Sequence, residues 1–160
     1  MQIKRFHCTA IVCLVLSLCL TGCGSFDKRT PVVKAYDKAK AAYNQREYNT
    51  AVAGLTSFLE NYPRSSLASL SRFYLAETYR QMKLYENAIA QYDDFIVKNT
   101  YTPLVPTAIY WKAFSLQQLD RYDEASSAYN SIILHFEDIA PDWAYCAEQR
   151  LIQLAPSLVE

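Results

Sequence analysis

YNTAVAGLTSFLENYP, residues 48–63, carries the pattern that decides the fold of this 160-residue chain. A shift of 37 residues aligns it with residues 85–100, and a second shift of 37 aligns it with residues 122–137. Each segment has an alanine at the same place, at Ala51, Ala88 and Ala125. Self-similarity that survives two successive shifts predicts a protein built from structural repeats.

The apolar spacing within each repeat is that of a helix. In the first repeat one stripe of an amphipathic helix is formed by Ala51, Leu55, Phe58, Leu59 and Tyr62. The segments around residues 32–44, 67–82 and 104–119 precede these stripes and carry alanine and aromatic residues at the same spacing. Each repeat is therefore expected to be a helical hairpin. The hairpins are expected to pack closely because small alanines face each other across the turn, as in the pairs Ala39 with Ala51, Ala76 with Ala88 and Ala113 with Ala125.

Prolines separate the repeats. The breaks contain Pro63, Pro103, Pro106 and Pro141. Thr102 is expected to cap the helix that follows, with Pro103 at its first position. A seventh helix, residues 142–155, places Trp143, Ala147, Leu151 and Leu154 on one side. This helix is expected to cover the exposed stripe of the last hairpin, as the end of a stacked repeat array requires.

The pattern Tyr48-x-x-Ala51 through Pro63 resembles the tetratricopeptide repeat, a helix-turn-helix unit with an alanine, aromatic and proline signature. The chain departs from that signature by its longer period and by Ala39, Ala76 and Ala113, which stand where glycine is common. The resemblance implies an all-α fold. It consists of three tetratricopeptide-like helical hairpins in a right-handed superhelical array plus a C-terminal capping helix.

The start of the chain has the layout of a secretory signal. Lys4 and Arg5 precede an apolar run from Cys8 to Leu20, which is shorter than the roughly 20 residues of a membrane-spanning helix. Leu20-Thr21-Gly22-Cys23 resembles the lipobox of bacterial lipoproteins. That resemblance implies loss of residues 1–22 and lipidation of Cys23. Several acyl chains would hold the protein on a membrane without spanning it, and the absence of Asp after Cys23 implies the outer membrane, facing the periplasm.

The amino-acid composition of the mature chain limits the kinds of binding partner. Loss of residues 1–22 removes Lys4 and Arg5, which leaves 14 basic against 16 acidic side chains. A net charge near −2 argues against nucleic acid. Cys146 would be the only cysteine besides Cys23, so no internal disulfide is expected, and an apolar packing role is favoured over a reactive thiol.

The sequence lacks the residue sets that catalysis or metal binding requires. His135 is the one histidine beyond the signal, and neither HExxH, paired cysteines nor a glycine-rich phosphate loop is present. Asp93 and Asp94 are adjacent on a helix and point about 100 degrees apart, so they are interpreted as a solvated face. Glu77 is interpreted as an isolated carboxylate. We therefore expect no enzyme activity, no cofactor and no metal; a hydrolase remains the less favoured alternative.

The first helices supply the candidate binding residues. In this repeat class they line the concave side, where extended peptides or partner helices lie. By helical spacing the inward-facing candidates are Tyr36, Lys40, Tyr43 and Asn44 in the first repeat, Phe73, Glu77, Arg80 and Gln81 in the second, and Tyr110, Phe114, Gln117 and Gln118 in the third. Packing between helices is the competing interpretation for Tyr36, Phe73 and Tyr110, because they recur at the period.

Phe58-Leu59-Glu60-Asn61-Tyr62-Pro63 within a 37-residue repeat is similar to periplasmic repeat proteins of two kinds. One is the family of the outer-membrane β-barrel assembly lipoprotein BamD, and the other is the Tol-Pal-associated division proteins. The resemblance implies three parts: a signal peptide over 1–22, a lipidated cysteine and tether over 23–30, and a repeat domain with its capping helix over 31–156. It also implies a non-catalytic adaptor for an envelope protein or an extended peptide, in β-barrel assembly or alternatively in Tol-Pal or division complexes.

Overall fold

A computed structural model describes residues 30–99 and 102–155 of the chain. Within this part every regular element is an α-helix. The helices are α2 (Pro31–Asn44), α3 (Tyr48–Asn61), α4 (Ala68–Gln81), α5 (Tyr85–Lys98), α6 (Val105–Gln117), α7 (Tyr122–Phe136) and α8 (Pro141–Leu154). The predicted all-α repeat fold is thereby confirmed. The signal segment and Cys23 lie outside the described residues.

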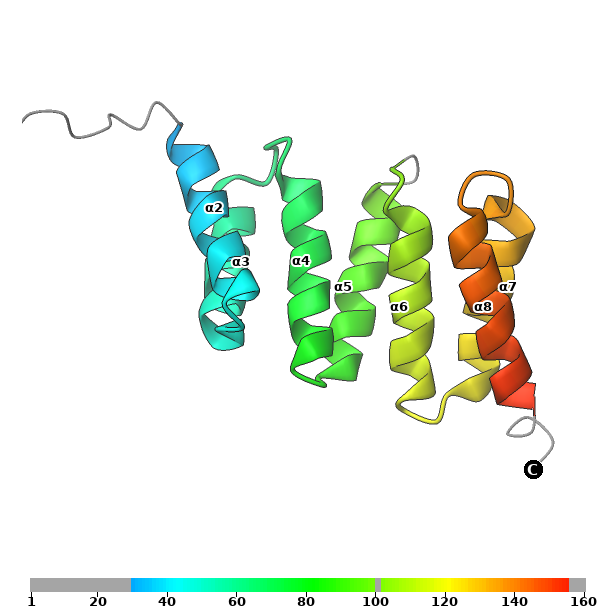
Figure 1. Cartoon of the computed structure of the whole chain (residues 1–160). Coiled ribbons are helices and arrows are strands. Elements are labelled where there is room, and N and C mark those ends of the chain that lie inside the picture. Colours follow the sequence, from blue (N-terminus) through cyan, green and yellow to red (C-terminus); the bar gives the residue numbers. More distant parts are fainter. Residues whose placement is uncertain (1–29, 100–101, 156–160) are drawn as a thin grey trace, which may run out of the picture. The chain divides into compact units, whose positions relative to one another are not determined.

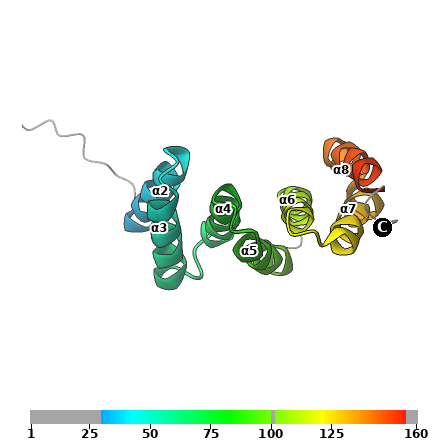
Figure 2. The same ribbon diagram turned by 90° about the horizontal axis from the view of Figure 1, so that it is seen from below.

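The repeat domain, Pro31 onward, is an array of hairpins that follow one another in chain order (Figure 1). Each helix packs mainly against the helices before and after it in the sequence, and α2 also touches α4 as α6 touches α8. Viewed along the helices, α2, α4, α6 and α8 form one layer and α3, α5 and α7 form a second (Figure 2). We call the first of these the first-helix layer.

Small residues set the separation of the two helices in each hairpin. The three predicted alanine pairs are buried, with exposed fractions of 3% or less for Ala39, Ala51, Ala76, Ala88, Ala113 and Ala125. In the first hairpin the approach is so close that a Cβ added to Gly54 would stand 2.9 Å from the Cβ of Ala39. A larger side chain at these places would force the helix axes apart, so the methyl groups determine the hairpin geometry.

Each hairpin turns through a residue with left-handed backbone geometry. Arg46, Lys83 and Asp120, spaced 37 apart, have φ angles of 63, 60 and 58 degrees. The next residue in each turn donates its backbone N–H to a carbonyl five residues earlier, as Leu84 does to Tyr79 at 3.0 Å. This is the Schellman arrangement that ends a helix, here without the glycine that usually occupies the left-handed position.

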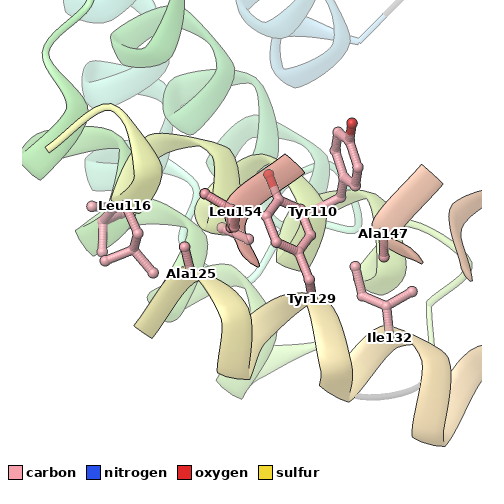
Figure 3. Close-up of a cluster of buried hydrophobic side chains, with 9 residues drawn as sticks. Tyr110, Leu116, Ala125, Tyr129, Ile132, Ala147 and Leu154 are labelled. Atoms are coloured by element: carbon pink, nitrogen blue, oxygen red, sulfur yellow. The ribbon is translucent and has the colours of Figure 1, made fainter. Parts of the chain in front are cut away.

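The buried side chains of the described residues form three clusters along the array, and partly buried rings such as Tyr74 and Trp111 each pack against two of them. Fully buried aromatic and aliphatic side chains of the second helices, such as Phe58, Tyr92 and Ile132, face the first helices. The capping helix behaves as predicted: Ala147 and Leu154 are buried, and Trp143 and Leu151 pack against the cluster formed by α6, α7 and α8 (Figure 3). Cys146 is half-buried against the same cluster, which fits the predicted packing role.

The start of the third hairpin differs from the expectation. Helix α6 begins at Val105 with Leu104 at its N-cap, and Pro106, not Pro103, lies in its first turn. Thr102 therefore does not cap the helix, and its buried hydroxyl has no hydrogen-bond partner among the described residues. The sequence holds two prolines three residues apart, and a helix that began at Pro103 would need the backbone N–H that Pro106 lacks, so α6 begins at Val105 with Pro106 in its first turn.

Candidate protein-binding surface

The first-helix layer carries all of the predicted partner-binding residues, because each of them belongs to α2, α4 or α6 or directly follows α6. They fall into three groups: aromatic rings in the interior, cations stacked on aromatic rings together with the polar side chains beside them, and exposed amides.

The interior group consists of Tyr36, Phe73 and Tyr110, which are exposed by only 8%, 7% and 7%. Each ring meets an aromatic ring of the second helix of its own hairpin edge-on: Tyr36 meets Phe58 at 5.9 Å, and Phe73 meets Phe95 at 5.5 Å. These contacts supply core packing energy, so the three rings hold the hairpins together and offer a partner little surface.

Between α2 and α4 a lysine lies on two tyrosine rings. The Nζ atom of Lys40 is 3.4 Å from the ring centroid of Tyr74 and 4.4 Å from that of Tyr43. It also donates a hydrogen bond to the Oδ1 atom of Asn44 at 3.0 Å. The rings of Tyr43 and Tyr74 are themselves 5.3 Å apart. Since Lys40, Tyr43 and Tyr74 are each partly exposed, this cluster presents an aromatic surface with one positive charge.

Between α4 and α6 the layer contains a buried ionic network, which corrects the interpretation of Glu77 as an isolated carboxylate. Glu77 is only 6% exposed. Its carboxylate accepts hydrogen bonds from Arg80 Nη2 at 2.7 Å, from Arg80 Nε at 3.3 Å and from the hydroxyl of Tyr92 on α5. The Arg80 guanidinium also lies 3.9 Å over the ring of Trp111 on α6. Two helices of one hairpin and the first helix of the next are thus tied together.

The electrostatics of this network favour a charged Glu77–Arg80 pair. Burial by itself lowers the pKa of Arg80, but the hydrogen bonds and charge of Glu77 more than offset that effect, so the pKa is raised. Burial, and next to it the negative charge of Glu77, raises the pKa of Tyr92 well above its usual value. Tyr92 therefore remains a neutral donor, and the buried carboxylate is compensated on both sides.

Between α6 and α8 the third cation is Arg150. Its guanidinium lies 5.6 Å from the ring centroid of Phe114, and its Nε atom donates to the hydroxyl of Tyr110 at 3.1 Å. Gln117, the next predicted residue on this face, is half-buried, and its Oε1 atom has no hydrogen-bond partner in the described part of the chain. One cation on an aromatic ring therefore occurs at each junction between neighbouring helices of the first-helix layer.

The remaining predicted residues are three exposed amides at the carboxyl ends of α2, α4 and α6. They are Asn44, Gln81 and Gln118, spaced 37 apart. An amide side chain donates and accepts, which is the capacity needed to hydrogen-bond an extended backbone.

Three residues of this surface are not among the twelve candidates: Tyr74, Trp111, which the sequence left equally open to docking or burial, and Arg150. Tyr74 and Trp111 are 37 apart, so the repeat period was a signal that could have found them. Arg150 lies on the capping helix, which was interpreted only as a cover for the last hairpin, and no repeat equivalent pointed to it.

The adjacent carboxylates of α5 have separate partners. Asp93 forms an ion pair with Lys112 at 2.6 Å, whereas Asp94 pairs with Arg72 at 3.1 Å and with Lys98. They do not converge on a common point. Over residues 30–99 and 102–155, no group of three or more His, Cys, Asp or Glu side chains has an arrangement that would hold a metal ion. In the same part of the chain no helix has both the length and the apolarity needed to cross a bilayer.

Two solved structures share the architecture. The TPR domain of Arabidopsis OM64 superimposes with a TM-score of 0.62 at 17% identity, over 76% of this chain and 94% of that one. The TPR2B domain of yeast Sti1, from its complex with pHsp70, superimposes with a TM-score of 0.59 at 16% identity, over 74% of this chain and 97% of that one. At these identities the likeness concerns the fold, which is that of a tetratricopeptide-repeat (TPR) domain.

The family of the chain is shown by a match to a protein-family sequence model. The chain belongs to the YfiO family of outer-membrane lipoproteins, whose model matches residues 28–141. This confirms the predicted relation to the BamD-like repeat lipoproteins. No curated protein sequence matches the chain. A TPR fold in an outer-membrane lipoprotein family suggests a protein-binding lipoprotein.

Proposed function

We propose that the protein is a non-catalytic adaptor, anchored by acyl chains on Cys23 to the periplasmic side of the bacterial outer membrane. It would hold an envelope protein or an unfolded chain during assembly of β-barrel outer-membrane proteins. The observation that carries the proposal is the first-helix layer, where a cation on an aromatic ring recurs at every junction beside a row of exposed amides. Membership of an outer-membrane lipoprotein family supports the location.

The chemistry of this layer suits an extended polypeptide. Aromatic rings provide contact area at low cost in side-chain entropy, and the amides of Asn44, Gln81 and Gln118 can bond peptide groups several residues apart along an extended chain. The cations Lys40, Arg80 and Arg150 are already held by aromatic rings, so little ordering would be required when a partner binds. This preorganisation favours specific binding of a polypeptide over non-specific binding.

A pair of photo-crosslinking positions tests the proposal in cells. Gln81 is exposed in the first-helix layer, and Asn87, the matched control, is exposed on α5 in the second layer. A photoreactive residue at Gln81 should capture a component of the β-barrel assembly machinery or a nascent barrel protein, and the same residue at Asn87 should not. Equal capture at both positions would contradict the assignment of the surface. Capture of Tol-Pal or division proteins alone would replace the assembly role with the alternative.

The anchor is tested separately. Cys23→Ser removes the thiol that would carry the diacylglycerol. The variant should therefore be absent from the outer-membrane fraction, and its mass should lack that of the acyl chains. Cys146→Ser is the matched control and should stay in the membrane fraction, because Cys146 packs against the cluster of α6, α7 and α8. Retention of the Cys23→Ser protein in that fraction would refute the anchor.

A further inference from the structure

A groove lies between α5 and α7 of the second layer, and α6 forms its floor. Helix α6 packs against both of these helices and lies between them along the array (Figure 2). The groove has a volume of about 530 Å³, and its apolar lining includes Ile96, Ile109, Leu116 and Ala128. None of the twelve predicted binding residues lines it. The groove is therefore a concave surface separate from the candidate surface of the first-helix layer.

Small side chains open this groove. In the 37-residue register, three larger residues of the second hairpin are replaced by smaller ones in the third: Tyr79 by Leu116, Gln91 by Ala128 and Asp94 by Ser131. Asp94 also forms an ion pair with Arg72 at 3.1 Å. The counterparts of that pair are Ser131 and Ile109, which line the groove without a bond between them. The third hairpin therefore has an open apolar surface where the second hairpin has bulky polar side chains.

Two strongly exposed aliphatic side chains stand at one end of the groove. Val97 and Leu134 are 77% and 76% exposed, and they occupy equivalent positions near the carboxyl ends of α5 and α7. Val97 lies one turn after Asp93, and Leu134 lies three residues after Ser131, so each is on the side of its helix that lines the groove. The first hairpin has Glu60 at this position. The exposed pair enlarges the apolar area that a partner would cover.

The opposite end of the groove is acidic. Asp123 and Glu124 lie in the first turn of α7 and line the groove there. Arg121 pairs with Glu124 at 2.6 Å and with Glu86 at 3.3 Å, so three carboxylates at this end share one cation. Within the part of the chain that the structure describes, no cation lies at ion-pair distance from Asp123. The surface therefore changes from apolar to negatively charged along the groove.

We propose that this groove binds an amphipathic helix of a partner protein. The apolar stripe of that helix would cover the floor of the groove, and a lysine or arginine near one of its ends would lie beside Asp123. The small side chains of Ser127 and Ala128 let a helix backbone approach closely. Lys112 in the lining does not oppose a basic partner, because Asp93 pairs with it at 2.6 Å. A groove between helices with an apolar floor and one acidic end matches a helix of this composition.

The site goes beyond the proposed function, because it requires no polypeptide on the first-helix layer. An adaptor with two independent surfaces would hold two partners at the same time, one on each layer. Asn87, the control position of the crosslinking experiment, is not part of the groove lining, so that control remains valid.

Three synthetic helices test the site on the full chain purified in detergent. The first is an alanine-rich peptide of about 18 residues, with leucines along one face and two lysines in its last turn, where they favour the helix. The second has glutamine in place of both lysines, and the third has the same leucines spread around the helix. Fluorescence anisotropy of the labelled peptides measures binding. The first peptide should bind saturably, the second about two- to fivefold more weakly, as expected for an exposed ion pair, and the third at least about tenfold more weakly.

Variants separate binding in the groove from uptake by detergent micelles, since the micelles are the same for every variant. Ala128→Gln introduces the side chain that the second hairpin has at Gln91, and it should weaken binding of the first peptide at least about fivefold. Ala90→Gln, the matched control, changes an exposed residue of α5 outside the lining and should keep binding within about twofold. Asp123→Asn should reduce the affinity for the lysine peptide to that for the glutamine peptide. Asp142→Asn, in the first turn of α8, should leave both affinities unchanged.

Equal binding by the unmodified protein and Ala128→Gln overturns the site, as does equal binding of the first and third peptides. Equal affinity for the lysine and glutamine peptides refutes a basic partner. Self-association in sedimentation that Ala128→Gln abolishes, without binding of any peptide, would make the groove a contact between two copies of the chain and refute the partner helix. The proposed function fails separately: loss of the crosslink at Gln81 with intact peptide binding refutes only the adaptor surface. A crosslink at Gln81 that survives without peptide binding refutes only the groove.

Discussion

Tyr92→Phe and Tyr129→Phe remove the same hydroxyl from equivalent positions, and we expect only the first to destabilise the protein. Both side chains are 0% exposed, and phenylalanine retains the ring packing of each, so no cavity forms. Tyr92 donates to the buried carboxylate of Glu77, whereas Tyr129 has no partner among the described residues. The pair therefore isolates the free energy of a hydrogen bond from that of packing.

The size of the expected loss in free energy of unfolding follows from the charge on the hydrogen-bond acceptor. A hydrogen bond to a charged group contributes about 1.5–3 kcal/mol, and Glu77 would keep its two bonds from Arg80, so we expect Tyr92→Phe to cost about 2 kcal/mol. Removal of an unpaired buried hydroxyl is neutral or stabilising by up to about 1 kcal/mol. With roughly 4 °C for each kcal/mol in a domain of this size, Tyr92→Phe should melt about 8 °C lower. Tyr129→Phe should melt at the same temperature as the unmodified protein or a few degrees higher.

Thermal and urea unfolding followed by circular dichroism measure both variants under the same conditions. The equilibrium slope in urea checks that the exposed area on unfolding is unchanged, so the comparison concerns the folded state. Equal losses in the two variants would refute the reasoning, because the two hydroxyls would then have equivalent environments. A larger loss for Tyr129→Phe would mean that its hydroxyl has a strong internal partner.

Three further perturbations test the backbone, the packing and the charges of the repeat array. Lys83→Gly relieves the left-handed backbone at φ 60 degrees and should raise the free energy of unfolding by about 1 kcal/mol in urea titrations; a loss would contradict the turn geometry. Gly54→Ala should destabilise by about 1–3 kcal/mol because its Cβ would lie 2.9 Å from that of Ala39, and adding Ala39→Gly should restore most of the loss in the same assay. Burial raises the pKa of Tyr36 to about 12, so as the pH rises the unfolded chain loses this proton before the folded chain does. The contribution of Tyr36 to stability should therefore be constant below about pH 10 and fall as the pH rises from about 10 to about 12. Urea midpoints and tyrosine absorbance measured against pH would show this fall. A midpoint that is flat up to pH 12 would contradict the burial of that hydroxyl.

The architecture was predictable because its signals are local and repeated. Helical periodicity is set by residues three and four apart, and the 37-residue period repeats the same pattern three times along the chain. The alanine pairs predicted the helix contacts as well, since alanine recurs at both facing positions of each hairpin. The hairpin turns were less visible: Arg46, Lys83 and Asp120 lack the glycine that marks a left-handed residue.

The network around Glu77 was not predictable from the same pattern. Its partner Tyr92 is 15 residues away on another helix, and the contact depends on how α4 and α5 are rotated against each other. Helical spacing placed Glu77 on a binding face, whereas the Tyr92 hydroxyl and the bidentate Arg80 draw the carboxylate inward. Charged residues are rarely buried without partners, so a sequence-based interpretation assigns them to solvent until the partner is seen.

The contrast between the two tyrosines separates hydrogen bonding from packing within one repeat register. Tyr92 and Tyr129 occupy equivalent positions, but Phe114 takes the place of Glu77 in the third hairpin, so only Tyr92 has a buried carboxylate that accepts its hydrogen bond. Loss of the Tyr92 hydroxyl should therefore lower the melting temperature, whereas loss of the Tyr129 hydroxyl should not, because that hydroxyl has no partner among the described residues. If ring packing alone mattered, both phenylalanine variants would keep the melting temperature of the unmodified protein, so the difference between the two variants measures the hydrogen bond.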